Sequence, residues 1–429
     1  MKTDREQLVK IIDFWQKSAK RNNLLNRVVL DAVDIKSREI IDLVGPRRSG
    51  KSSVLKLIIK KMKLKDNFLY LNFEDPFFVE NNKAEIIEEV VSVYQEYFNS
   101  SLKYLFFDEI QEIKNWEKAV RKLRDGGNFK IFITGSSSKL LSRELSSLIT
   151  GRHLSYRVYP LSFVEFLDFE NIRIKNKKDI IIREKMLHKK FGEYLEWGGF
   201  PEVVLEKNHE LLKNYFFDIL EKDVMARYDI RDKTTLEKMA VFLLSNSAKI
   251  TTIESLKSNF NLSYETAAAY LEHFKDSLLL FELPQFSFSL KKQNKALKKF
   301  YSVDIGLAKN ASFKFSEDKG RILENAVFLE LNRSARKLYY YKTKDGLEVD
   351  FFSKEKENNG ELIQVSWSVG EKTVREREIK SLFSAMNELK MKKGLILTFG
   401  ESDIIKKDGK EIAIKPVYRW MLEKELKTL

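Results

Sequence analysis

The stretch GPRRSGKS, Gly45–Ser52, decides the fold that this sequence predicts. It matches the pattern G-x-x-x-x-G-K-[ST] at every fixed position. The apolar run EIIDLV precedes it, and the helical pattern KSSVLKLIIKKM follows it. A glycine-rich loop between a strand and a helix turns its backbone N–H groups toward phosphate oxygens, and the helix N-terminus adds positive partial charge. We therefore expect nucleotide phosphates to bind at Gly45, Pro46, Arg47, Arg48, Ser49, Gly50, Lys51 and Ser52, with Ser53 supporting the turn.

Three more short apolar runs surround this loop in the expected fold. They are FLYLNF (68–73), YLFFDE (104–109) and KIFITG (130–135), and helical segments separate them. Because their apolar residues are consecutive, they predict strands buried on both faces of a parallel sheet. Residues 1–160 are therefore expected to form a doubly wound α/β domain of the P-loop NTPase class, with a helix over residues 1–30.

Two carboxylates, Asp108 and Glu109, end the run YLFFDE. In a phosphate-loop protein, a strand-end aspartate and the loop hydroxyl hold Mg²⁺, while the loop lysine reaches the β- and γ-phosphates. We expect Asp108 and Ser52 to be the metal ligands and Lys51 to contact the phosphates. Glu109 is placed to polarise an attacking water, which favours a hydrolase over a kinase. The alternative interpretation is that both acids only end a strand.

Two further positions are candidates for contact with the γ-phosphate. In KIFITGSSS, Ser136 or Ser137 could act as a sensor at the end of a strand, although a helix cap is the alternative. Arg152, in ITGRHLSYRVY, could stabilise charge on the γ-phosphate of its own or a neighbouring subunit. A surface or structural role for Arg152 stays open.

Composition excludes several other kinds of site. The 429 residues contain no cysteine and four histidines, so disulfides and thiolate metal sites are excluded and a histidine-rich metal site is disfavoured. No run of 18 apolar residues occurs, and the N-terminal stretch MKTDREQLVKIIDFW has no apolar segment typical of a secretory signal. We expect a cytoplasmic protein without a membrane partner. The net charge of +14 favours anionic partners, or else a basic solvated surface.

The middle of the chain predicts helices and then a winged helix. Residues 161–232 are expected to be a helical lid or linker, interrupted by WGGFPEVV (197–204). Residues 233–300 show three helical patterns and an apolar hairpin in LLLFELPQFSFSL (278–290). The third helix offers Tyr264, Glu265, Thr266 and then alanines, a poor set for reading bases. DNA binding and protein contact both stay open, and the lysines that suit phosphate contact are Lys291, Lys292, Lys295, Lys298 and Lys299.

Residues 301–429 predict a small α/β domain with the outline of a nuclease site. A PD-(D/E)xK nuclease needs a helix carboxylate, a strand-end aspartate, and Glu-x-Lys on the next strand. Glu324 and Asp350 fill the first two positions, but Gln364 and Ser366 replace the glutamate and the lysine. Lys372 is a conceivable replacement cation. An active nuclease, a degenerate nuclease fold with a vestigial site at Glu324, Asp350 and Gln364, and an unrelated hairpin stay open.

Several stretches together resemble a known group of proteins. They are GPRRSGKSS, YLFFDEIQEIKNWEKAVRKL, FITGSSSKLL, GRHLSYRVYPLSFVEF and WGGFPEVV, and they are similar to the archaeal and bacterial AAA-type ATPases of the archaeal-ATPase group, related to the STAND and AAA+ classes. In that group a winged helix and a nuclease-like domain follow the ATPase domain, and YFFDILEKDVMARYDIRD and ILENAVFLELNR resemble that region.

The resemblance implies ATP and Mg²⁺ as cofactors and ATP hydrolysis through Lys51, Ser52, Asp108 and Glu109. It is compatible with an oligomer, and it names no substrate. Three hypotheses follow: an ATPase that moves its C-terminal module, with DNA or a protein as partner; an ATP-gated DNA nuclease; and a STAND-like switch that binds a protein partner.

Overall fold

A computed structural model of the chain describes residues 5–20, 24–127, 129–136, 153–311, 318–334, 337–354 and 360–426. The chain divides into two compact units. The N-terminal unit comprises residues 1–159 with 276–278, and the C-terminal unit comprises residues 160–275 and 279–429. Each unit has a sheet and a core of its own.

The N-terminal unit is built on a five-stranded parallel sheet with the order β2-β3-β4-β1-β5. The strands are β1 (Ile40–Val44), β2 (Phe68–Asn72), β3 (Tyr104–Asp108), β4 (Lys130–Gly135) and β5 (His153–Arg157). The α/β fold with a parallel sheet is confirmed, and β4 lies between β1 and β3. The sequence did not predict β5, because its residues HLSYR are mostly polar and only partly buried, as suits an edge strand.

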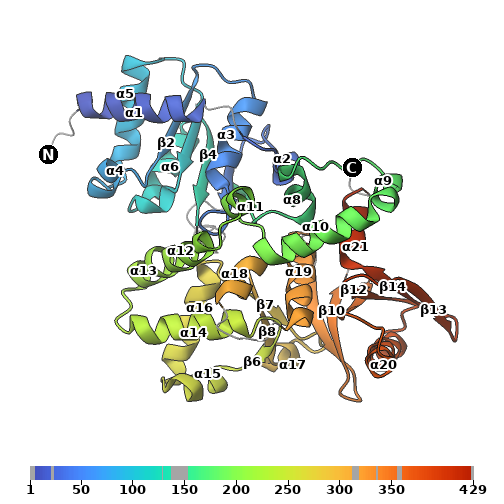
Figure 1. Cartoon of the computed structure of the whole chain (residues 1–429). Coiled ribbons are helices and arrows are strands. Elements are labelled where there is room, and N and C mark those ends of the chain that lie inside the picture. The colour runs from blue at the N-terminus through green and yellow to red at the C-terminus, as the bar shows by residue number, and fades with distance from the viewer. Residues whose placement is uncertain are drawn as a thin grey trace. The chain divides into compact units, whose positions relative to one another are not determined.

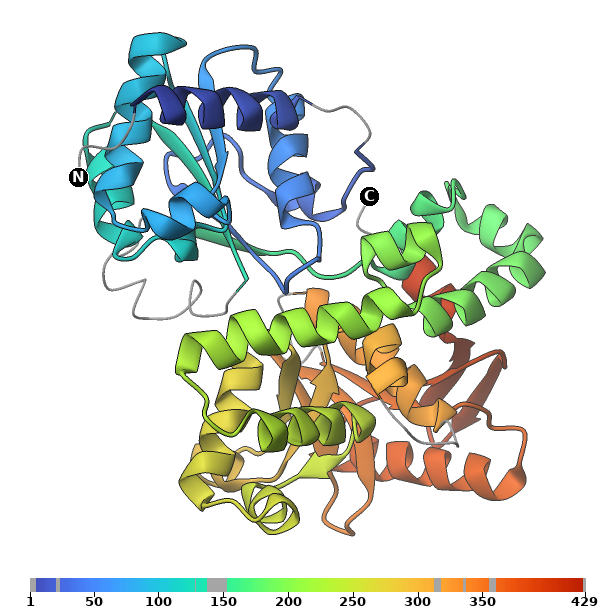
Figure 2. The same ribbon diagram turned by 60° about the vertical axis from the view of Figure 1, so that its left-hand side comes forward.

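Helices cover this sheet. They are α1 (Arg5–Ala19), α2 (Val29–Ala32), α3 (Lys51–Lys61), α4 (Pro76–Glu80), α5 (Glu85–Tyr97) and α6 (Trp116–Asp125), with a 3₁₀ turn at Ile110–Glu112. The dark-blue α1 lies across the strands and contacts β2 and α5, while α3 contacts β3 and β4 (Figure 2). In the core, Val54 and Ile58 of α3 pack with Ile41, Phe106 and Phe132 of the strands. This packing fixes the start of α3 beside the carboxyl end of β1.

The expected helix over residues 1–30 is too long. It ends at Ala19, and residues 24–27 have no regular structure. After the helix, the Arg27 guanidinium donates to the carbonyls of Ser49, at 2.7 Å, and Tyr159, at 2.6 Å. The segment is therefore anchored to the phosphate loop.

The C-terminal unit begins with a run of helices, as predicted for this part of the chain. They are α8 (Phe163–Phe169), α9 (Lys177–Ile182), α10 (Glu184–Trp197), α11 (Pro201–Glu206), α12 (Glu210–Asp218), a π-helix (Ile219–Met225) and α13 (Ala226–Tyr228). The turn between α10 and α11 contains Gly198 and Gly199. The Gly199 N–H donates to the Asp304 carboxylate at 2.6 Å, and its carbonyl accepts from the Leu161 N–H at 2.6 Å. Burial raises the pKa of Asp304 to about 6.

Gly198→Ala is expected to lower the free energy of unfolding by about 3 kcal/mol or more. Gly198 has a φ of +74°, and a Cβ there would lie 2.2 Å from Asp304 Oδ1. Urea unfolding measures the loss. Gly346→Ala is the matched control, because Gly346 has a φ of +80° with nothing within 4 Å of the added Cβ. Equal losses in the two variants would contradict the steric account.

A second group of elements forms a small antiparallel sheet with the order β6-β8-β7. The elements are α14 (Lys233–Ser245), β6 (Ile250–Thr251), α15 (Ile253–Phe260), α16 (Tyr264–Asp276), β7 (Leu280–Pro284), α17 (Leu290–Lys295) and β8 (Lys298–Ser302). The hairpin predicted within residues 278–290 is wrong, because the partner of β7 is β8. The basic run folds instead: Ser289 caps α17, and buried Phe300 and Tyr301 hold β8 in the sheet.

The last part of the chain forms a six-stranded mixed sheet with the order β13-β14-β12-β11-β10-β9. Its elements are α18 (Ile305–Ala311), α19 (Lys319–Arg333), β9 (Lys337–Lys342), β10 (Glu348–Lys354), β11 (Gly360–Val365), α20 (Lys372–Glu388), β12 (Lys393–Thr398), β13 (Asp403–Lys407), β14 (Lys410–Pro416) and α21 (Val417–Glu425). The strands of this sheet lie between α19 and α20 (Figure 1). Phe351 lies near Phe328 of α19, whereas Phe352 packs in the core that α20 shares. Because successive strand residues face opposite ways, α19 and α20 cover opposite faces.

No helix among the described residues is long and apolar enough to cross a membrane.

Candidate nucleotide site and carboxylate cluster

The loop Gly45–Ser52 connects the carboxyl end of β1 to α3. Two positions of the loop favour glycine. A Cβ on Gly45 would lie 2.1 Å from the Val158 carbonyl oxygen, and Gly50 has a φ of +95°. Arg48 also has a positive φ, and Arg47 forms an ion pair with Glu74. Ser49 is buried, and its Oγ has no hydrogen-bond partner among the described residues. The loop therefore presents an unsatisfied polar group where a ligand could bind.

Asp108 lies at the centre of a hydrogen-bond network behind this loop. Its carboxylate accepts from Thr134 Oγ1 at 2.5 Å, from the Tyr70 hydroxyl at 2.9 Å and from the Ser52 side chain. Burial and the neighbouring Glu109 raise the pKa of Asp108, while these hydrogen bonds oppose the rise. A serine hydroxyl beside an aspartate is a hard oxygen donor set, which fits Mg²⁺.

Glu109 is buried and adopts a left-handed conformation, with a φ of +50°. Its N–H donates to Thr134 Oγ1 at 2.8 Å, so one hydroxyl positions both acids. Its carboxylate lies 3.0 Å from the Lys51 ammonium and accepts from Gln111 Nε2 at 2.6 Å. Burial raises the pKa of Glu109, but Lys51 and Arg47 outweigh burial and hold that pKa below its usual value. Glu109 is therefore ionised at neutral pH.

Of the predicted residues, Lys51, Ser52, Asp108 and Glu109 are thus brought together. Ser136 follows β4 and is buried, and its Oγ lies 3.5 Å from Gln111 Nε2. Ser53 lies in the first turn of α3. Arg152 and Ser137 lie outside the described residues. The prediction missed Thr134, Tyr70 and Gln111, and the available signal for Thr134 was a polar residue at the end of the apolar run KIFIT.

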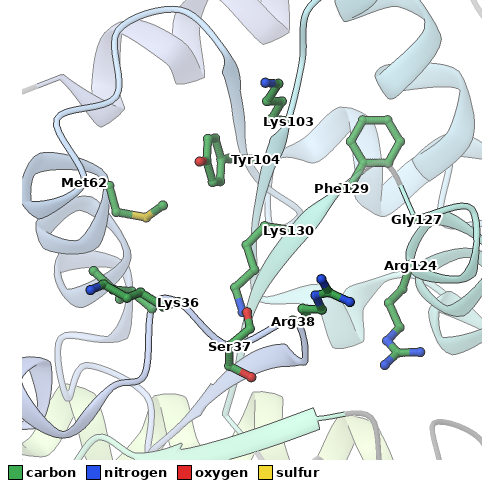
Figure 3. Close-up of a pocket in the computed structure, with 11 residues that line it drawn as sticks. Lys36, Ser37, Arg38, Met62, Lys103, Tyr104, Arg124, Gly127, Phe129 and Lys130 are labelled. Carbon is green, nitrogen blue, oxygen red and sulfur yellow. The ribbon is translucent and has the colours of Figure 1, made fainter.

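A basic pocket of about 980 Å³ lies at the opposite end of the same strands (Figure 3). Tyr104 and Lys130, the first residues of β3 and β4, line it, whereas the phosphate loop follows the last residue of β1. Figure 3 shows Lys130 directed toward Ser37, whose carbonyl accepts from its ammonium at 2.5 Å. Burial lowers the pKa of Lys130 to about 8. The cationic residues of the pocket are Lys36, Arg38, Lys103, Arg124 and Lys130.

In the C-terminal unit, the candidate nuclease residues also meet, but around a lysine. Glu324 lies on α19, and Asp350 and Gln364 lie on the paired strands β10 and β11. The buried ammonium of Lys299, on β8, lies 3.0 Å from Glu324 and 3.2 Å from Asp350. Lys299 is therefore not available for phosphate contact, and that part of the prediction is wrong.

One other expectation for this cluster is also wrong. Lys372 is not the replacement cation, because its side chain is 88% exposed and pairs with Glu376 on its own helix. Gln364 does lie beside Asp350, since its carbonyl oxygen accepts from the Asp350 N–H at 3.3 Å. Burial and Asp350 raise the pKa of Glu324 to about 7, although Lys299 and Tyr301 oppose that rise.

Sequence comparisons agree with the N-terminal architecture. Residues 37–167 match an AAA domain family. The chain is 39% identical over 423 residues to protein MJ1544 of Methanocaldococcus jannaschii, covering 94% of this chain and 92% of that protein. The chain belongs to this family of AAA-domain proteins. It is also 30% identical to a Haemophilus influenzae protein, covering 82% of this chain and 88% of that one.

The region after the AAA domain matches two families of unknown function. One covers residues 188–318 and the other residues 319–418. Solved structures similar to the chain include the Thermotoga maritima RuvB branch migration motor, with 14% identity, a TM-score of 0.28, and 65% and 89% coverage of the two chains. Another is the Aeropyrum pernix ORC1 protein in complex with DNA, with 9% identity, a TM-score of 0.29, and 72% and 92% coverage.

Proposed function

We propose that this AAA-domain protein binds Mg-ATP at the loop Gly45–Ser52 and hydrolyses it. The observation that carries this proposal is the network around Asp108, in which Ser52, Thr134, Glu109 and Lys51 converge behind the phosphate loop. Ser49 Oγ and Gln111 Oε1 support it, because both are buried and neither has a partner among the described residues, which suits a ligand or water.

Each residue of the site has a role in this proposal. The loop N–H groups and the Lys51 ammonium bind the β- and γ-phosphates. Ser52 and Asp108 hold Mg²⁺, which neutralises charge developing on the phosphate oxygens. The ionised Glu109, oriented by Gln111 and Thr134, accepts a hydrogen bond from the attacking water. Ser136 senses the γ-phosphate through Gln111. Arg152 is the candidate for stabilising charge on the γ-phosphate.

We further propose that ATP hydrolysis drives a movement of the region that follows the ATPase domain. The ATPase domain covers 1–160, a helical lid or linker 161–232, a winged-helix-like domain 233–300, and a degenerate nuclease-like domain 301–429. The order α14, β6, α15, α16, β7 and β8, with antiparallel β7 and β8, supports the winged helix. A STAND-like switch with slow turnover shares the same site. An ATP-gated nuclease is disfavoured, because Lys299 forms ion pairs with both carboxylates of the candidate nuclease site, Glu324 and Asp350.

DNA is the partner class that charge favours. The chain carries a net charge of +14, and five cationic residues line the basic pocket together with Tyr104 and Phe129. Lys291, Lys292 and Lys295 of α17 are exposed and add to the basic surface. These groups suit a phosphodiester backbone, whose binding is driven by counterion release.

Phosphate release from ATP tests the function. We expect release that needs Mg²⁺, stops in EDTA and rises several-fold with single- or double-stranded DNA. The DNA effect should weaken as salt rises, because phosphate contacts are screened. Mg²⁺-dependent release without any DNA effect would favour a protein-directed switch. ATP binding with no detectable release would contradict hydrolysis.

A further inference from the structure

The carboxylate cluster of the C-terminal unit contains its own cation. The Lys299 ammonium lies 3.0 Å from Glu324 Oε1, 3.2 Å from Asp350 Oδ1 and 2.7 Å from Glu348 Oε1. Glu324 and Asp350 accept hydrogen bonds from this ammonium, and Glu348 forms a third ion pair with it. Only 4% of the Lys299 side chain is exposed, so this is a buried ion cluster and not a surface pair.

A pocket of about 490 Å³ is lined by Glu324, Asp350 and Gln364, but the Lys299 ammonium already occupies the point between the two carboxylates. Mg²⁺ and Mn²⁺ need oxygen ligands at about 2.0–2.2 Å, inside the space that the ammonium occupies between these carboxylates. A cation held there would also lie within about 4 Å of the fixed charge of Lys299, which repels it strongly in a buried site. The second carboxylate oxygen of Asp350 also has a hydrogen-bond partner, because it accepts from the Val365 N–H at 2.9 Å.

We propose that Lys299 is a built-in cation that replaces a divalent metal at the Glu324–Asp350 cluster and closes it to metal. Glu324 and Asp350 thereby accept hydrogen bonds from Lys299 in place of binding a metal ion. This inference does not depend on ATP hydrolysis, because every residue in it belongs to the C-terminal unit.

The cluster also joins two parts of the chain that match different families. Lys299 lies in the segment 188–318, and its acceptors lie in the segment 319–418. Neighbouring contacts reinforce the junction: the Tyr301 hydroxyl donates to Glu324 at 2.7 Å, and the Ser302 N–H donates to Asn325 Oδ1 at 2.9 Å. The ion cluster therefore locks β8 onto α19 and β10.

Manganese binding tests the proposal with the metal alone as probe. Bound Mn²⁺ would be counted by electron paramagnetic resonance in nucleotide-free wild type, Lys299→Met, Asp350→Asn and the double variant. We expect wild type and Asp350→Asn to bind Mn²⁺ alike, because the cluster takes none. Lys299→Met should gain one Mn²⁺ site per chain, with an affinity on the order of 100-fold above the residual Mn²⁺ binding of the wild type. The double variant should lose this site.

Thermal unfolding gives a second readout on the same proteins. Lys299→Met should melt several degrees below wild type, because it leaves buried carboxylates without a cation. Mn²⁺ should restore much of that loss in Lys299→Met and leave wild type unchanged. Asp350-dependent Mn²⁺ binding by the wild type would overturn the proposal. So would a folded Lys299→Met that gains no manganese site. If Lys299→Met does not fold, the comparison of wild type with Asp350→Asn decides alone.

Discussion

Lys51→Ala is expected to weaken Mg-ATP binding by about 100-fold or more, which corresponds to roughly 3 kcal/mol. The Lys51 ammonium is 3% exposed and is held by the Pro46 carbonyl, at 3.2 Å, and by Glu109. It is therefore already oriented at the mouth of the phosphate loop, and its loss removes a charge-assisted contact to the β- and γ-phosphates. Titration with a fluorescent ATP analogue measures the affinity.

Lys60→Ala is the matched control, because Lys60 lies on the same helix and is exposed. Its affinity for ATP should equal that of wild type. Thermal unfolding of Lys51→Ala must accompany the titration, since this variant leaves the buried Glu109 without its nearest cation. A folded Lys51→Ala protein with wild-type affinity would remove Lys51 from the proposed phosphate contacts.

Glu109→Gln is expected to keep ATP binding and to slow hydrolysis by about 1000-fold. Glutamine has nearly the same shape but cannot accept a proton from water. The pKa of Glu109 lies below its usual value, so the wild-type group is ionised and ready to act at neutral pH. Single-turnover phosphate release measures the chemical step.

The control for this variant is Glu85→Gln, which changes an exposed carboxylate at the start of α5 in the same unit. Its turnover should match wild type. Affinity should change little in Glu109→Gln, or rise, because the Lys51 ammonium no longer pairs with a carboxylate. Wild-type turnover in Glu109→Gln would contradict the proposed role of this residue.

The N-terminal sheet was predictable because of how its strands are buried. Runs such as YLFFD and KIFIT are apolar at consecutive positions, and a parallel sheet covered on both faces leaves that mark on the sequence. The edge strand β5 leaves no such mark. The helix expected over residues 1–30 is too long, and the contacts of Arg27 with Ser49 and Tyr159, which hold the chain after it, are tertiary and leave no local pattern.

The site was predictable where a local motif carries it and not where strand order decides it. Lys51, Ser52, Asp108 and Glu109 follow from two short motifs. Thr134 contacts both acids only because β4 pairs directly with β3. Sequence spacing alone does not give that pairing.

Lys299 is the clearest case of a contact hidden from the sequence. It lies 25 residues before Glu324 and 51 residues before Asp350, in a basic run that the sequence predicts to contact phosphate. Its neighbours Phe300 and Tyr301 place β8 in the sheet, and this buries the ammonium against α19 and β10. The cation beside Glu324 and Asp350 thus comes from an element that the motif does not include.

The most direct test of the proposed ATPase measures ATP binding and phosphate release on the same preparations of wild type and Glu109→Gln, with Mg²⁺ present. The account predicts that both proteins bind ATP with similar affinity and that only the wild type releases phosphate in repeated turnovers. Equal release by the two proteins, or wild-type protein that binds no ATP, would contradict it.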